Sequence, residues 1–209
     1  MTRPLLRRAA LCDVAAIVAI KQRLRLEPAQ EPTRGGFLLG CSAERYAALV
    51  AAANVLMLEV GGEPAGFAIT LPDPVLRASE LWSRRDHILW KPGEAAPPEG
   101  DAVAYFDQLA VSPDAPRLHV AALAFAAVRT LADTGHRHLY ATTLRAPVTN
   151  RAAFPLLDAL GARRVGEVEE LYADVGPVVS DLHHSVLPAD FDRVNRGAGG
   201  RRLRSYAVA

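Results

Sequence analysis

The stretch DQLAVSPDAPRLHVAALAFAAV, residues 107–128, contains the pattern that decides the fold. It starts as a β-prone run, passes through a turn that holds two prolines, and continues as a long alanine-rich run typical of a helix. Arg117 lies where this turn meets the predicted helix, at about residues 118–134. Because the first N–H groups of a helix have no partners within it, a helix start beside an arginine predicts a binding place for phosphate.

The rest of the chain alternates between short β-prone runs and longer runs with helical spacing. The predicted strands are residues 4–8, 103–111, 138–144, 164–171 and 178–187, with a hairpin at 55–72 that turns at Gly61 and Gly62. The other predicted helices are residues 12–27, capped by Asp13, residues 43–53, capped by Ser42, and residues 151–160. Residues 72–101 are predicted to be irregular. Helices that alternate with strands predict a mixed α/β sheet.

The composition excludes several classes of protein. Half of the 209 residues are hydrophobic, 22% are charged, and the formal net charge is +1, so no overall field attracts nucleic acid or an anionic membrane. No apolar run approaches the roughly twenty residues that a membrane span needs, and no secretory signal is visible. We therefore expect a cytoplasmic protein with no nucleic-acid or membrane partner. Residues 1–190 are expected to form one domain, and residues 191–209 an arginine- and glycine-rich tail, loose at 195–204.

The order of strand, turn, arginine, helix, strand, asparagine, helix and glycine over residues 103–161 is specific. It resembles the core of the GNAT superfamily of acyl-CoA-dependent N-acyltransferases, over roughly residues 4–187. The family's Leu-x-Val-x-Pro strand end is matched by Leu109, Val111 and Pro113. Its phosphate loop, Gln/Arg-x-x-Gly-x-Gly/Ala, aligns with Arg117, Leu118, His119, Val120, Ala121 and Ala122. Its later Asn-x-x-Ala-x-x-x-Tyr-x-x-x-Gly motif aligns with Asn150, Ala153, Leu157 and Gly161.

The resemblance implies a GNAT fold, which is a central mixed, mostly antiparallel sheet with splayed central strands and helices on both faces. It also implies acetyl-CoA as the acyl donor, with its pyrophosphate at the helix start and its pantetheine along the splayed strand. The implied donor-binding residues are Leu109, Ala110, Val111, Arg117, Leu118, His119, Val120, Ala121, Ala122 and Asn150. For His119, donation to a phosphate and a solvent-facing position in the turn are both open.

Amine attack on a thioester needs a neutral amine and a proton for the departing thiolate. Since alternate residues of a strand share a face, Tyr105 and Asp107 are expected to point the same way, together with Leu109 and Val111. Family members place a base on this strand, so Asp107 is the candidate base or counter-ion. Tyr105 is the candidate acid, because Leu157 stands where the family has its tyrosine. A structural role in the core is the alternative for both residues.

Three aromatic residues are expected on the acceptor side. Trp82 and Trp90 lie in the long segment before the catalytic strand, and Phe37 lies in the loop between the first two helices. Covering the core is the alternative for the two tryptophans. No metal site is expected, because the adjacent His183 and His184 point to opposite faces of a predicted strand.

We therefore expect an N-acyltransferase that transfers an acetyl or other acyl group from acetyl-CoA to a primary amine of a small molecule or peptide. Val120 replaces the first glycine of the family's loop, and its β-branched side chain crowds the approach of a phosphate. Two alternatives stay open: a donor carried on an acyl-carrier protein, and a GNAT-fold binding protein without catalysis. Self-association as a homodimer also stays open.

Overall fold

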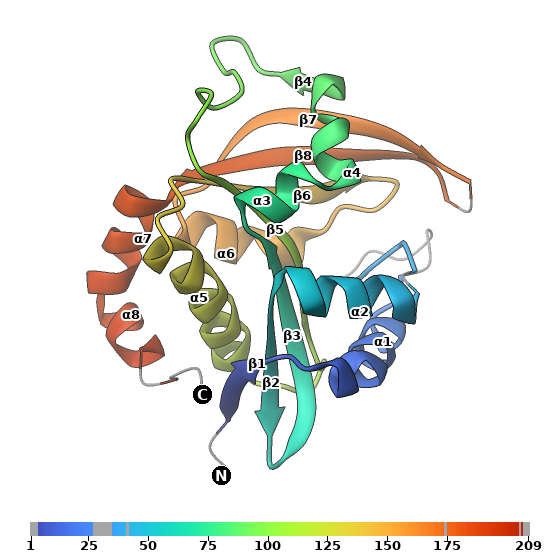
Figure 1. Ribbon diagram of the computed structural model, residues 1–209, viewed down its shortest axis with the longest axis vertical. Coiled ribbons are helices and arrows are strands. Elements are labelled where there is room, and N and C mark those ends of the chain that lie inside the picture. The colour runs from blue at the N-terminus through green and yellow to red at the C-terminus, as the bar shows by residue number, and fades with distance from the viewer. Residues whose placement is uncertain (1–3, 27–34, 41, 174, 205, 207–209) are drawn as a thin grey trace.

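The computed structural model describes residues 4–26, 35–40, 42–173, 175–204 and 206. Within these residues the chain forms an eight-stranded sheet in the order β1-β2-β3-β5-β6-β8-β7-β4 (Figure 1). Neighbouring strands are antiparallel except β5 and β6, which are parallel, so the expected mixed, mostly antiparallel sheet is confirmed. The strands are β1 (Leu5–Arg8), β2 (Asn54–Val60), β3 (Glu63–Leu71), β4 (Ile88–Trp90), β5 (Val103–Val111), β6 (His138–Ala146), β7 (Arg163–Tyr172) and β8 (Gly176–Val186).

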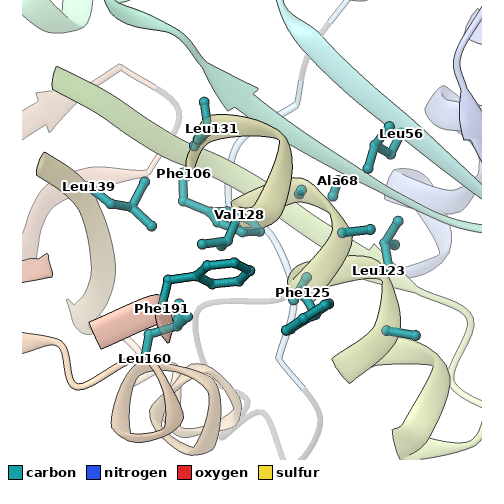
Figure 2. Close-up of a cluster of buried hydrophobic side chains, with 14 of the residues drawn as sticks. Leu56, Ala68, Phe106, Leu123, Phe125, Val128, Leu131, Leu139, Leu160 and Phe191 are labelled. Carbon is teal, nitrogen blue, oxygen red and sulfur yellow. The ribbon is translucent and has the colours of Figure 1, made fainter. Parts of the chain in front are cut away.

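Helices cover both faces of the sheet, as expected (Figure 1). On one face lie the short helix η1 (Leu11–Asp13), α1 (Val14–Arg23) and α2 (Ala43–Ala52), whose buried side chains form one core with Phe67 and Ile69. On the other face lies α5 (Arg117–Asp133), whose apolar residues form a second core with Leu56, Ala68 and Phe106 (Figure 2). Small alanine side chains all round α5 let its backbone approach the sheet closely, so the helix is buried on most sides.

The two helix caps predicted from the sequence have different outcomes. Ser42 caps α2 as expected, since its hydroxyl accepts from the N–H of Arg45 at 3.3 Å. Asp13 makes no side-chain cap for α1. Its carboxylate instead accepts from the N–H of Ala10 at 2.7 Å and from Arg7 at 2.7 and 2.8 Å, so the cap prediction is wrong.

Strand β5 contains a β-bulge that the sequence pattern did not predict. In the pairing with β3, Ile69 lies opposite Gln108 and Thr70 lies opposite Phe106, so Asp107 is the extra residue. Beyond the bulge the alternation of faces changes. Leu109 and Val111 pack against the α5 core, whereas Tyr105 belongs to the α1 core. The expectation that all four odd-numbered residues share a face is therefore wrong after position 107.

The segment predicted to be irregular, residues 72–101, contains three short helices and a strand. These are α3 (Asp73–Arg77), α4 (Glu80–Ser83), η2 (Arg85–His87) and β4. Asp73 anchors the segment by accepting from the N–H of Val103 at 2.9 Å and from Arg77 at 2.8 Å. Strand β4 then pairs with β7 and extends the sheet. Elements of three to five residues are too short to show a period in the sequence, which explains the missed prediction.

The expectation of a loose end at residues 195–204 is wrong. Helix α7 (Leu187–Arg196) crosses the predicted domain boundary at residue 190, and α8 (Ala198–Leu203) follows it. Phe191 is buried in the α5 core with its ring centroid 5.1 Å from that of Phe125 (Figure 2). Leu187 and Phe191 thus both dock this helix on the core, and its charged residues are Asp190, Asp192, Arg193 and Arg196. In the described part of the chain, no helix has the length and apolar character required to cross a membrane.

Candidate active site

The central parallel strands separate in the middle of the sheet. Strands β5 and β6 pair only over residues 103–106 and 138–141. Beyond these residues they diverge, and a cavity of about 220 Å³, the central cavity, lies at the opening. Residues 106–111 of β5 form one wall, and Thr142 and Thr143 of β6 lie on the other. The predicted splay of the two strands is confirmed.

The edge of β5 that faces the central cavity offers backbone hydrogen-bonding groups. The N–H of Ser112 donates to the carbonyl of Ala65 in the direction of β3, at 2.7 Å. Because such bonds alternate along an antiparallel pair, Ala110 also bonds toward β3, opposite Phe67. The N–H and C=O groups of Leu109 and Val111 therefore point to the side from which β6 has diverged. Ala110 lines the cavity without directing its backbone groups into it.

The start of α5 lies at one end of the same cavity. Arg117 is the first residue of the helix and is exposed, and the side chain of Val120 lines the cavity. The N–H of His119 donates to the carbonyl of Pro116 at 2.8 Å. The His119 ring is buried with its centroid 6.4 Å from that of Tyr206, so a solvent-facing position for this side chain is excluded. Ala122 is buried in the α5 core, and Leu118 and Ala121 are half-buried.

Asp107, on the bulge, places a carboxylate in the central cavity. Gln108 Nε2 donates to Asp107 Oδ2 at 3.1 Å, and the Tyr46 hydroxyl donates to Gln108 Oε1 at 2.9 Å. Burial raises the pKa of the Asp107 carboxyl, and the hydrogen bond from Gln108 and the charges of Lys21 and Arg45 oppose that rise. A carboxylate with a raised pKa is a stronger base than an ordinary aspartate.

Tyr105 lies near Asp107 but lines a different cavity. This side cavity, of about 120 Å³, also has Trp82 and Trp90 in its walls. The Tyr105 and Thr142 hydroxyls are 2.6 Å apart, and Thr142 lines both cavities. Burial, followed by the charge of Asp107, raises the pKa of the Tyr105 hydroxyl, so it stays protonated at neutral pH. The two predicted catalytic residues thus line different cavities, and Thr142 lies between the Tyr105 hydroxyl and the cavity that holds Asp107.

The predicted residues Phe37 and Asn150 both line the central cavity. The Phe37 ring lies under the ammonium of Lys21, which is 4.8 Å from the ring centroid. Asn150 Oδ1 is buried and has no hydrogen-bond partner among the described residues, so it is an acceptor directed into the protein interior. Leu157 is buried and lines the cavity at the position where the family has its tyrosine.

Two polar residues of this cavity were missed by the sequence analysis. Thr143 Oγ1 and His183 Nε2 lie 2.9 Å apart on the neighbouring strands β6 and β8. Burial lowers the pKa of the His183 imidazole, which favours its neutral form. Residues forty positions apart in the chain become neighbours only through the sheet order, and the sequence carries no local signal of that pairing. Within the described residues, no group of three or more metal-ligating side chains is present.

Comparisons with known proteins find similarity in structure alone. No family model and no curated protein matches the sequence. The ribosomal-protein-S18-alanine N-acetyltransferase of Escherichia coli aligns with a TM-score of 0.60 and 18% identity, over 88% of this chain and 94% of that one. Arabidopsis thaliana NAA60, solved with a bisubstrate analogue, aligns with a TM-score of 0.59 and 15% identity, over 88% and 98%.

A third solved structure, an acetyltransferase of the GNAT family from Streptococcus pneumoniae, aligns with a TM-score of 0.55 and 18% identity. The alignment covers 88% of this chain and 99% of that one. Each of the three alignments covers 88% of this chain, and the divergence of β5 and β6 agrees with the splayed centre that the sequence resemblance implied. The chain therefore has the fold of the GNAT superfamily of N-acetyltransferases.

Proposed function

We propose that the protein is an N-acyltransferase that transfers an acetyl group from acetyl-CoA to a primary amine. The observation that carries this proposal is the position of Asp107, a carboxylate with a raised pKa on the bulge of β5, at the point where β5 and β6 separate. The solved structures of similar fold include N-acetyltransferases that act on ribosomal-protein alanine, which agrees with this chemistry.

The pantetheine end of the donor would lie in the central cavity. The backbone groups of Leu109 and Val111 point to the diverged side of β5, where they would pair with the amides of pantetheine as a neighbouring strand does. Ala110 lines the central cavity, and Asn150 Oδ1 is a buried hydrogen-bond acceptor in its wall. At the other end, Arg117 and the N–H groups at the start of α5, within residues 118–122 but without that of His119, which donates to Pro116, would bind the pyrophosphate.

Proton transfer in this proposal involves three side chains. Asp107 takes a proton from the ammonium form of the acceptor, and the neutral amine then attacks the thioester carbonyl. The C–N bond forms, the C–S bond breaks, the departing thiolate takes up a proton, and the nitrogen returns its surplus proton to the group that protonated the thiolate. Tyr105 supplies that proton through the Thr142 hydroxyl, since Thr142 faces the central cavity and lies 2.6 Å from the Tyr105 hydroxyl.

A steady-state assay tests the proposal. Purified protein is mixed with acetyl-CoA and a panel of primary amines, and the released thiol is followed while calorimetry measures acetyl-CoA binding. We expect saturable binding of acetyl-CoA and thiol release that depends on the amine. Binding without release from any amine would leave a GNAT-fold binding protein as the better description.

One observation favours a second candidate, transfer from an acyl-carrier protein. The Val120 side chain lies in the cavity wall at the start of α5, where the family's glycine leaves space for the pyrophosphate. A carrier-bound pantetheine arm lacks that pyrophosphate, so the valine would not obstruct it. Failure to bind acetyl-CoA, together with thiol release from an acetylated carrier protein, would favour this candidate.

A further inference from the structure

The segment of residues 73–97 encloses the side cavity against the sheet. Helices α3 and α4 and strand β4 place Leu76, Leu81 and Ile88 in its walls, and Val103, Val168 and Leu182 close it from the sheet. Trp82 and Trp90 complete the lining, and the Trp90 ring meets the Tyr140 ring edge-on, with 6.4 Å between the centroids. The lining is therefore mostly aliphatic and aromatic, and Arg84, Arg85, Glu170 and Thr142 complete it.

The charged side chains around the side cavity already have partners, either an opposite charge or the Trp82 ring. Arg84 and Glu170 form an ion pair at its border. The guanidinium groups of Arg77 and Arg85 lie over the Trp82 ring, 4.6 and 5.2 Å from its centroid, and hold the indole in place. Because these charges already have partners and the remaining walls are apolar, the cavity favours an uncharged ligand group.

The side cavity adjoins the central cavity through one pair of hydroxyls. Thr142 lines both cavities, and the Tyr105 hydroxyl closes on it at 2.6 Å. Asp107 lies on the central side of this pair, near enough for its charge to act on Tyr105. Thr142 is therefore the point at which an amine attached to a group in the side cavity would approach the central cavity and Asp107.

We propose that the acceptor is a small primary amine that carries one uncharged, ring-sized group, and that this group binds in the side cavity. An apolar cavity of roughly 150 Å³ holds benzene in an engineered protein, and the side cavity of about 120 Å³ has a comparable volume. The inference rests on the proposed function for the fate of the amine, whereas occupancy of the side cavity is measured separately.

The chain provides its own reporter of that occupancy. Its two tryptophans, Trp82 and Trp90, both line the side cavity, so intrinsic tryptophan fluorescence responds to a ligand bound there. We expect a saturable response to 2-phenylethylamine and a dissociation constant about ten- to a hundredfold larger for ethylamine, which lacks the ring. In turnover with acetyl-CoA, kcat/KM is expected to favour 2-phenylethylamine by the same factor.

A matched pair of variants locates the binding. Val168→Phe adds a ring on β7 inside the side cavity and is expected to weaken 2-phenylethylamine binding at least tenfold. Leu171→Phe adds the same ring on the same strand at a position that is 81% exposed, and it is expected to bind like the wild type. Circular dichroism and acetyl-CoA binding of both variants report whether the fold is kept.

The readouts separate this inference from the proposed function. Ring-dependent fluorescence that Val168→Phe abolishes, without thiol release from any amine, would retain the side cavity as a ligand site and reject the transferase. Thiol release that is equally efficient with ethylamine, without a fluorescence response to 2-phenylethylamine, would overturn the inference and retain the transferase.

Discussion

The chemistry assigned to Asp107 depends on one extra residue in β5. A strand without the bulge would place the residue at this position in regular pairing with β3. The bulge leaves Asp107 in the wall of the central cavity, where burial raises the pKa of its carboxyl. Its position on the strand was predictable from the sequence. The raised pKa was not, because it depends on walls contributed by other elements.

Replacement of Asp107 by asparagine is expected to lower turnover by about 10²–10⁴-fold, the usual contribution of a general base. In the wild type, the carboxylate becomes protonated as the pH falls, so turnover should decline with an apparent pKa above the roughly 3.9 of an unperturbed aspartate. The asparagine variant should lack this acid limb. The measurement is kcat across pH with an accepted amine.

The matched control for this experiment is Asp114→Asn, at an exposed position in the turn before α5. It removes the same charge outside the cavity, and both turnover and its pH profile should be kept. An acid limb that persists in Asp107→Asn would assign that titration to another group.

Contacts between residues that are far apart in the chain could not be predicted from the sequence. Thr143 and His183 meet across β6 and β8, and no spacing rule connects them. By contrast, Arg117 and Val120 were placed correctly at the start of a helix, because that prediction used only neighbours in the chain. Local patterns were sufficient to predict the helix start, and the opposite wall of the cavity required the sheet order.

Helix α5 combines a buried body with an exposed start. Arg117 is exposed, whereas residues 122–128 are buried in the core. The backbone of the first turn is therefore held in place by the packing of the following turns. A ligand at this start would meet N–H groups whose positions are already fixed, which favours binding because little ordering is needed.

Two substitutions at this helix start are expected to change acetyl-CoA affinity in opposite directions. Arg117→Ala removes a charge-assisted contact of roughly 1.5–3 kcal/mol, so the dissociation constant should rise about ten- to a hundredfold. Val120→Gly removes the side chain that lines the cavity and should strengthen binding, despite a helix-propensity cost of up to about 1 kcal/mol. Calorimetry measures both constants.

Arg129→Ala is the control for Arg117, since Arg129 lies on the same helix near its other end and pairs with Asp133. Its dissociation constant should equal that of the wild type. Weaker binding in Val120→Gly would show that the valine packs against the bound donor, and a role as an obstruction would then be rejected.

The short elements between β3 and β5 show why one segment escaped prediction. Each of α3, α4 and β4 has five residues or fewer, so none completes enough turns or alternations to show a period. Their positions come from tertiary contacts, such as the hydrogen bond from the N–H of Val103 to Asp73. The intrinsic secondary-structure propensity of such short segments has little influence, because packing against the rest of the protein determines their conformation.

The folded molecule as a whole holds a histidine pair whose buried member, His184, is expected to make its stability depend on pH. His184 is buried, its Nε2 lies 2.9 Å from Nδ1 of His138, and Nε2 of His138 lies 3.1 Å from Asp101 Oδ2. Burial, with further contributions from His138 and Arg163, lowers the pKa of the His184 imidazole to about 4. Because the unfolded chain binds this proton more readily, the contribution is present above about pH 6.5 and is lost as the pH falls to about 4.

We expect this one group to remove on the order of 3 kcal/mol of unfolding free energy across that interval. His184→Gln should flatten the pH dependence by this amount, and His87→Gln, at an exposed position, should leave it unchanged. Denaturant titrations at several pH values measure the difference. An equal slope in His184→Gln and the wild type would place the acid-sensitive group elsewhere.

The two edge strands of the sheet are poorly suited to self-association by strand addition. The outermost strands are β1, with four residues, and β4, with three, so each offers a foreign strand only a short row of backbone groups. Next to β4, the outer part of β7 carries the exposed Glu169, whose charge opposes the pairing of identical edges. Strand addition between copies, the first step toward amyloid-like fibres, is thus disfavoured. A homodimer of this chain would have to join through side chains of its helices or sheet faces and not through a continuous sheet.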